Sequence, residues 1–132
     1  MDIHIETPYE NCSLSLIDIR FNDNSDMECT VEFNSGWLSC KRYQAFKKKK
    51  ISLFLSRIKN ISKPFDVMAV LEDIKENMQL QVECIAPGII MIAGEFYEQS
   101  EFEQQARLGF NITEEKMKAF VNQMNALLTN TE

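Results

Sequence analysis

The chain has 132 residues, 45% of them hydrophobic and 26% charged, with three prolines and four glycines. This composition excludes an intrinsically disordered chain, and the length is enough to bury a core without disulfides or metals. The formal net charge of -6 at pH 7 would repel nucleic-acid phosphates at long range. We therefore expect one domain over residues 1–132.

The charge is divided unevenly along the chain. Residues 1–65 contain ten Lys or Arg and eight Asp or Glu, whereas residues 66–132 contain four and twelve. Between Lys41 and Lys63 there are nine basic residues and no acidic one. The sequence thus predicts a basic region followed by a strongly acidic one.

The N-terminal segment MDIHIETPYENC carries acids where an export signal needs a basic start and an apolar core, so no export signal is predicted. No apolar run approaches the roughly 20 residues that span a bilayer. The four cysteines are widely spaced without a CxxC pair, which favours reduced thiols over a zinc or redox site. We expect a cytoplasmic protein with no membrane contact, no metal and no other cofactor.

The first half of the chain predicts a three-stranded meander. Residues 14–21, LSLIDIRF, alternate with a phase shift between Leu16 and Ile17 that is typical of a β-bulge. Residues 27–33, MECTVEF, alternate strictly, as in a half-buried strand. A turn rich in Asn, Ser and Gly then leads into a third strand that begins near Trp37, for which we expect burial, although tryptophan is also a common interface anchor.

A helix is predicted over residues 48–61, because the apolar residues Leu53, Phe54, Ile58 and Ile61 recur at helical spacing. Residues 65–74 fit either a strand or a short helix, and we favour the strand. Residues 78–85 and 89–97 are two further strand candidates, joined by a proline-glycine turn.

A last strand is predicted over residues 102–110, with Phe102, Ala106, Leu108 and Phe110 on one face. Thr113 then caps a second helix, whose first turn carries two glutamates that suit the positive helix N-terminus. The apolar stripe of this helix comprises Met117, Phe120, Val121, Met124, Leu127 and Leu128. The expected class is α+β, an antiparallel sheet of about six to seven strands with two amphipathic helices packed on one face.

Residues with catalytic chemistry are scarce. His4 is the only histidine, so a nucleophilic triad or a histidine-based zinc site would depend on it alone. The chain contains no GxSxG, HExxH, P-loop or GxGxxG motif. The loop over residues 23–26 lacks the glycine and the glutamate of a calcium loop. We therefore predict a protein that is not an enzyme.

Acidic and aromatic side chains cluster around the turn between the last two predicted strands. Carboxylates next to an aromatic ring suit a basic protein partner, through steering and charge-assisted hydrogen bonds. A solvated hairpin edge, protected from aggregation by its charges, is the alternative interpretation. The predicted partner-binding residues are Glu95, Tyr97, Glu98, Glu101 and Glu103.

The stretch FKKKKISLF, residues 46–54, has two interpretations. A nucleic-acid contact would use Lys47–Lys50 within the basic segment 41–63, with Tyr43 and Arg57 available as readers. On one continuous helix, however, Lys47 and Lys50 would share the side of Phe54. We favour a solvated strand-to-helix turn.

The order of features resembles bacterial immunity proteins of the WapI type. The matching stretches are MECTVEF, the turn SGW, the helix ISLFLSRIKNI, the paired strands ENMQLQVECIAPGIIMIAGEFY, and ARLGFNIT leading into EEKMKAFVNQMNALL. The resemblance implies a small cytoplasmic protein that neutralises the toxin domain of a polymorphic or contact-dependent system.

We therefore expect an immunity protein that binds a cognate toxin domain and blocks it by occlusion. Toxin nucleases tend to be basic because they bind phosphates, which suits an acidic inhibitor. The alternatives are a protein-interaction or adaptor domain of unrelated purpose, and a nucleic-acid-associated factor that uses residues 41–63.

Overall fold

The computed structural model describes residues 1–61, 63, 64, 66 and 68–130. Within them the chain runs twice through the same plan, an antiparallel four-stranded meander followed by a helix. The first unit, with sheet A, comprises β1 (Ile3–Glu6), β2 (Cys12–Phe21), β3 (Met27–Ser35), β4 (Leu38–Phe46) and α1 (Lys48–Lys59). The second, with sheet B, comprises β5 (Ala69–Glu72), β6 (Met78–Ala86), β7 (Ile89–Gln99), β8 (Glu103–Thr113) and α2 (Glu114–Thr129).

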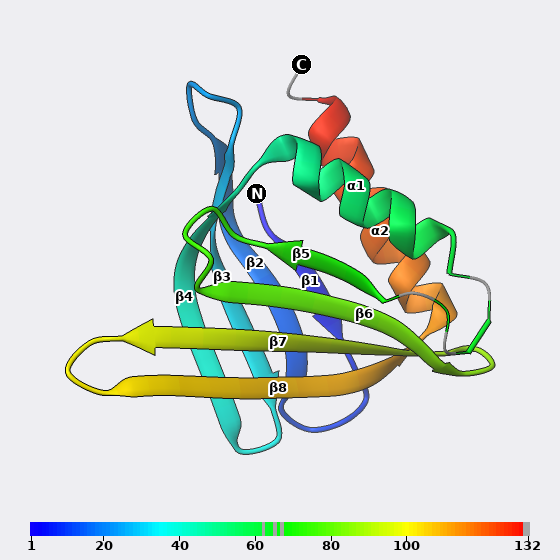
Figure 1. Cartoon of the computed structure of the whole chain (residues 1–132). Coiled ribbons are helices and arrows are strands. Elements are labelled where there is room, and N and C mark those ends of the chain that lie inside the picture. Colours follow the sequence, from blue (N-terminus) through cyan, green and yellow to red (C-terminus); the bar gives the residue numbers. More distant parts are fainter. Residues whose placement is uncertain (62, 65, 67, 131–132) are drawn as a thin grey trace.

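The α+β class and the two helices are confirmed, but the prediction of one sheet of six to seven strands is wrong. There are two four-stranded sheets, and their strands cross at a steep angle (Figure 1). Alternating polar and apolar residues identify a strand, but they do not identify the strand that it pairs with. Here β5 pairs with β6 and not with β4, so sheet A ends with β4, directly before α1. The short strand β1 was not predicted.

The two sheets contact each other through Phe33 of β3, which is fully buried. Its ring centroid lies 6.4 Å from that of Phe96 on β7 and 5.3 Å from that of Phe110 on β8. Gly94 allows this approach, because a Cβ atom there would lie 3.0 Å from Cδ2 of Phe33. The missing side chain therefore fixes how closely β3 can cross β7.

The helices lie together on one side of the molecule, with α1 beside β5 and α2 beside β1 (Figure 1). The predicted cap of α2 is confirmed, since Thr113 Oγ1 accepts a hydrogen bond from the Lys116 backbone N–H at 3.3 Å. The predicted apolar stripe of α2 is its buried face.

The buried face of α1 differs from the predicted one. It comprises Ile51, Phe54, Leu55 and Ile58, whereas Leu53 is 51% exposed. A spacing of three, four and seven residues places Ile51 with Phe54, Leu55 and Ile58, and Leu53 lies outside that stripe.

Three further strand predictions can be compared with the structure. The strand favoured within 65–74 is confirmed for β5, while Phe65 and Val67 lie outside the described residues. The bulge in β2 is present, with its register shift between Ile17 and Arg20, slightly later than predicted. The predicted inward face of β8 holds for Leu108 and Phe110 only.

Trp37 was expected to be buried, and this is wrong. It is 92% exposed, at the turn between β3 and β4 where Gly36 adopts a positive φ of 66°. The turn lies at the end of sheet A, where none of the described elements covers the indole.

The four cysteines are free; Cys29 and Cys84 are buried, and Cys12 and Cys40 are half-buried. Burial raises the pKa of the Cys29 thiol to about 12. In the part of the chain that the structure describes, neither helix combines the length and apolar character needed to cross a bilayer.

Candidate protein interface

The hairpin of β7 and β8 extends beyond the rest of sheet B (Figure 1). The pairing of β6 with β7 reaches only to Met78 opposite Phe96, whereas β7 and β8 stay paired out to Gln99 opposite Glu103. Residues Tyr97–Gln105 therefore form a two-stranded projection, which we call the hairpin arm. Because the arm leaves the packed body, its side chains are exposed on both faces, which explains why Phe102 is not buried. Ala106, directly before the arm on β8, is exposed as well.

The tip of the hairpin arm carries an exposed aromatic residue flanked in the sequence by two glutamates. Phe102 is 69% exposed and stands between Glu101 and Glu103 in the turn. Neither carboxylate forms an ion pair with a described basic side chain. The Nε2 amide of Gln99 donates a long hydrogen bond of 3.4 Å to Glu103 Oε1. The tip thus combines exposed apolar area with negative charge that the protein itself does not neutralise.

Glu95 lies at the base of the arm and is engaged by its neighbours. The Tyr97 hydroxyl donates to Glu95 Oε2 at 2.5 Å, and Arg107 Nε donates to Oε1 at 3.2 Å. The Tyr97 hydrogen bond is the main reason that the pKa of Glu95 is lowered; Gln81 and Arg107 act in the same direction and burial opposes them. The same hydrogen bond raises the pKa of Tyr97. Glu95 therefore orients Tyr97 instead of facing solvent as a free carboxylate.

Glu98 is shared with sheet A. Arg42 Nη1 of β4 lies 3.2 Å from Glu98 Oε2 and donates to the Tyr97 carbonyl oxygen at 2.9 Å. The Arg42 side chain is 23% exposed, whereas that of Glu98 is 52% exposed. This contact attaches the arm to the body of the protein and leaves one side of the Glu98 carboxylate accessible.

A buried polar network supports the arm from below. Asp73 is 2% exposed, and its Oδ1 accepts the backbone N–H groups of Asn77 and Met78, both at 2.9 Å. Gln44 Nε2 donates to Asp73 Oδ2 at 2.7 Å and to Asn77 Oδ1 at 2.8 Å. The Asn77 carbonyl accepts the Tyr97 backbone N–H at 2.8 Å. The turn between β5 and β6 therefore connects β4 to the start of the arm.

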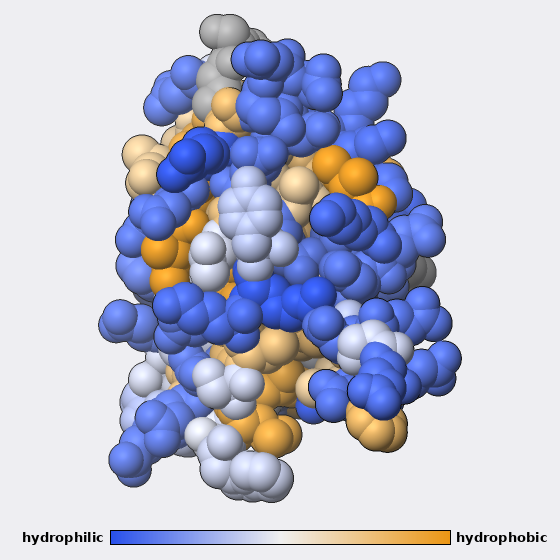
Figure 2. Space-filling model, turned by 90° about the vertical axis from the view of Figure 1, so that its left-hand side faces the viewer, coloured by the Kyte–Doolittle hydropathy of each residue, from blue (hydrophilic) through white to orange (hydrophobic). Residues whose placement is uncertain are grey.

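A polar hollow of about 530 Å³ lies between the arm and this turn. Its walls are polar or charged almost throughout, and they comprise Lys75, Glu76, Asn77, Tyr97, Glu98, Gln99, Glu103, Gln104 and Gln105. Figure 2 views the molecule from the side on which the arm projects, where hydrophilic residues dominate and apolar ones form small separate groups. Such a surface suits a polar or charged partner segment.

The structure brings the five predicted contact residues to the arm and its base but gives them different roles. Glu101 and Glu103 lie at the tip without an ion pair to a described basic side chain, and Tyr97 is 36% exposed. Glu98 is shared with Arg42, and Glu95 is bonded to Tyr97 and Arg107. Sequence reasoning did not assign Phe102 to the interface, although its flanking acids were a signal. The sequence pattern also did not predict the hydrogen bonds between Gln44 and Asp73. The one signal in the sequence was a polar residue, Gln44, at an inward-facing position of β4.

Trp37 and Leu38 form a second exposed apolar point, at the turn between β3 and β4. Ser35 Oγ donates to the Gly109 carbonyl oxygen at 2.6 Å, which holds this turn against β8. The two turns that carry exposed aromatic residues therefore both connect to β8. The turn with Trp37 contacts this strand at Gly109, and the turn with Phe102 leads into its first residue, Glu103.

The lysine run occupies the start of α1. Lys47 is the N-cap residue, without a side-chain cap hydrogen bond, and Lys48–Lys50 form the first turn. The lysines straddle the strand-to-helix turn as expected, but three of them belong to the helix. Positive charges at a helix N-terminus oppose the macrodipole, so the run is electrostatically unfavourable for α1 itself.

Among the described residues, no group of three His, Cys, Asp or Glu side chains is arranged to hold a metal ion. Neither a protein-family model, nor a curated protein, nor a solved structure matches this chain. The resemblance to WapI-type immunity proteins stays a prediction.

Proposed function

We propose that this protein is an immunity protein, which binds a cognate bacterial toxin domain and neutralises it by occlusion. The observation that carries the proposal is the exposed Phe102 at the tip of the hairpin arm, flanked in the chain by Glu101 and Glu103, neither of which forms an ion pair with a described basic side chain. An apolar anchor surrounded by charge is the arrangement that binds a partner with both area and specificity.

The arm is supported well enough to act as a rigid docking element. Arg42 bonds both the Glu98 carboxylate and the Tyr97 carbonyl, and Glu95 fixes the Tyr97 hydroxyl. A pre-ordered surface loses less conformational entropy on binding than a flexible loop does. This supports tight, stoichiometric inhibition of a partner.

The charge of the arm suggests which partner it binds. A domain that cleaves nucleic acid must attract phosphates, so its active site is basic. Glu101 and Glu103 would meet the lysines and arginines of such a site, while the arm covers the opening. The protein would act by blocking access, without chemistry of its own and without a cofactor, in the cytoplasm where the toxin acts.

An adaptor domain of unrelated purpose is the first alternative, and it would use the same arm. The experiment that separates the two is co-expression with the C-terminal domain of a large secreted protein encoded next to this one. We expect a stable complex and rescue of growth from the toxicity of that domain. Complex formation without growth rescue would indicate an adaptor, and no complex at all would refute the proposal.

A nucleic-acid-associated factor is the second alternative, and the exposed lysines at the start of α1 favour it. Changing Lys47–Lys50 to Gln distinguishes the two functions. The immunity protein should keep its affinity for the toxin domain after this change, because the arm is untouched. If the wild-type protein bound DNA or RNA and the variant did not, the nucleic-acid function would replace the one proposed.

A further inference from the structure

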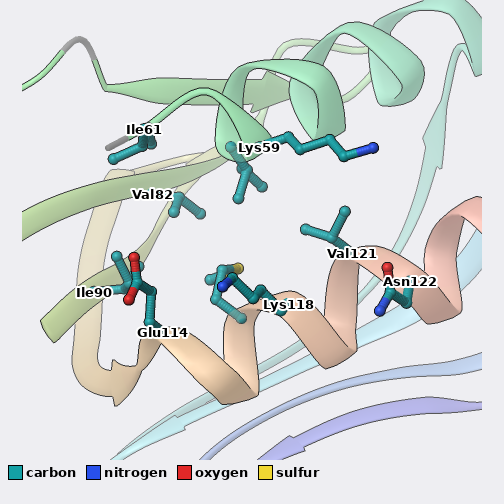
Figure 3. A pocket seen from close by; sticks show the side chains of 10 residues that line it. Lys59, Ile61, Val82, Ile90, Glu114, Lys118, Val121 and Asn122 are labelled. Carbon is teal, nitrogen blue, oxygen red and sulfur yellow. The ribbon is translucent and has the colours of Figure 1, made fainter. Parts of the chain in front are cut away.

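A second recess lies between the end of α1 and the start of α2, over β6 and β7 (Figure 3). Its volume is about 230 Å³. An apolar cavity of ~150 Å³ is already large enough to bind benzene. The recess can therefore hold a small organic group.

The wall of this recess belongs to the core. Ile58 of α1, Val82 of β6, Ile90 of β7, and Met117 and Val121 of α2 line it, and each is at most 6% exposed. A lining of buried side chains from four elements means that the recess penetrates between the helices and sheet B. An apolar chain entering it would leave water for well-packed hydrophobic surface.

The opening of the recess is charged. Lys59 extends from α1 on one side, and Lys118 extends from α2 on the other (Figure 3). Among the described residues neither lysine takes part in an ion pair. Asn122 adds an amide at the rim, and among the described lining residues Glu114 is the only carboxylate. Two ammonium groups against one carboxylate make the opening positive, in a chain whose net charge is -6.

We propose that this recess binds a small apolar carboxylate, such as a medium-chain fatty acid. The hydrocarbon chain would lie among Ile58, Ile90 and Val121, and the carboxylate would lie at the opening, between Lys59 and Lys118. The apolar lining suits a hydrocarbon chain, and a neutral ligand would gain nothing from the two lysines at the opening. The site is at the helices, far from the hairpin arm, so it does not depend on the proposed function (Figure 1).

The test uses the purified full chain with sodium octanoate and with 1-octanol as the neutral analogue. We expect saturable octanoate binding by calorimetry, with methyl NMR shifts confined to the lining residues Ile58, Ile61, Val82, Ile90, Met117 and Val121. Each methylene added from hexanoate to octanoate should raise the affinity about fourfold, since a buried methylene contributes a constant transfer free energy.

The following variants separate the contribution of the ligand's carboxylate from that of its hydrocarbon chain. Changing Lys59 and Lys118 to Gln together should lower octanoate affinity about fivefold and leave octanol affinity unchanged. The control changes Lys49 and Lys50 to Gln, which removes the same charge from the far end of α1. Glu114→Gln should tighten octanoate binding, because it removes the one negative charge at the opening.

Three results would overturn the proposal: no octanoate binding at millimolar concentration, methyl shifts elsewhere in the molecule, or equal affinity for octanoate and octanol in every variant. Val121→Phe fills the recess and should abolish binding of both ligands. If that variant does not fold, the methyl shifts and the Glu114→Gln comparison still decide the question.

Discussion

Arg42 and Glu98 join the two sheets at the base of the hairpin arm, with Arg42 Nη1 lying 3.2 Å from Glu98 Oε2. The same nitrogen donates to the Tyr97 carbonyl oxygen at 2.9 Å. One side chain of sheet A thus holds both a side chain and the backbone of the projecting arm. Several measurable properties should depend on this contact and on the groups next to it.

Removing the guanidinium should loosen the arm. We expect Arg42→Gln to lower the free energy of unfolding by about 1–2 kcal/mol, since a half-buried charge-assisted hydrogen bond and an ion pair are both lost. Urea denaturation measures this, and amide hydrogen exchange should accelerate over Tyr97–Gln105. The matched control is Lys41→Gln, because Lys41 is 65% exposed and lies 3.8 Å from Glu32. A change as large in the control would show that the Arg42 contact is not special.

The Asp73 network should be more costly to break. Asp73→Ala removes the acceptor of three backbone N–H groups, those of Lys75, Asn77 and Met78, and one of the two acceptors of the Gln44 amide. We therefore expect a loss of about 2–4 kcal/mol in the free energy of unfolding. Asp23→Ala, in an exposed turn, should stay within about 0.5 kcal/mol of the wild type. Equal effects of the two changes in urea denaturation would mean that the network does not stabilise the turn.

The lowered pKa of Glu95 predicts a specific pH dependence. A carboxyl whose pKa is lower in the folded than in the unfolded state adds stability above its unfolded pKa. That stability is lost as the pH falls through the folded pKa. The wild type should therefore be more stable than Glu95→Gln at neutral pH, and the difference should shrink on acidification. A difference in unfolding free energy that does not vary with pH would contradict the assignment.

Tyr97→Phe tests the cause of that pKa, because the Tyr97 hydroxyl is the largest contribution to it. The pKa of Glu95, followed by carboxyl NMR, should rise toward its ordinary value in this variant. Tyr43→Phe removes a different exposed hydroxyl and should leave the Glu95 titration unchanged.

Gly94 should not tolerate a side chain. A Cβ atom there would lie 2.9 Å from Cε2 of Phe96 and 3.0 Å from Cδ2 of Phe33. We expect Gly94→Ala to cost about 1–3 kcal/mol through overpacking. Phe33→Leu frees part of that space, so the double variant should be less destabilised than the sum of the two single variants. Strict additivity in thermal or urea unfolding would exclude the close approach as the cause.

Much of the fold could be predicted from local patterns. Strict alternation in MECTVEF identified β3, and Thr113 with the apolar stripe after it identified α2. The pairing of strands could not be predicted, because β4 and β5 carry no local mark of belonging to different sheets. The exposure of Trp37 and Phe102 could not be predicted either, because it depends on how far each hairpin extends beyond the neighbouring strands. That length is known only once the crossing of the two sheets is known.

The sequence pattern placed the predicted contact residues on one hairpin, but it could not show which of them are engaged by neighbouring side chains. Carboxylate spacing identified the acidic hairpin, yet it could not show that Glu95 is engaged by Tyr97 and Arg107. Arg42 lies 56 positions before Glu98 in the chain, so their contact appears only once the two sheets pack.

The proposed function requires that the tip of the hairpin arm bind a basic toxin domain. The most direct test measures the affinity of that domain for Phe102→Ala combined with Glu101→Lys and Glu103→Lys, at low and high salt. The control, Glu10→Lys with Glu115→Lys, reverses the same two charges at exposed sites away from the arm. We predict a loss of at least about 100-fold for the arm variant with a weaker salt dependence, and less than about threefold for the control. Equal affinities for the two variants would contradict the account.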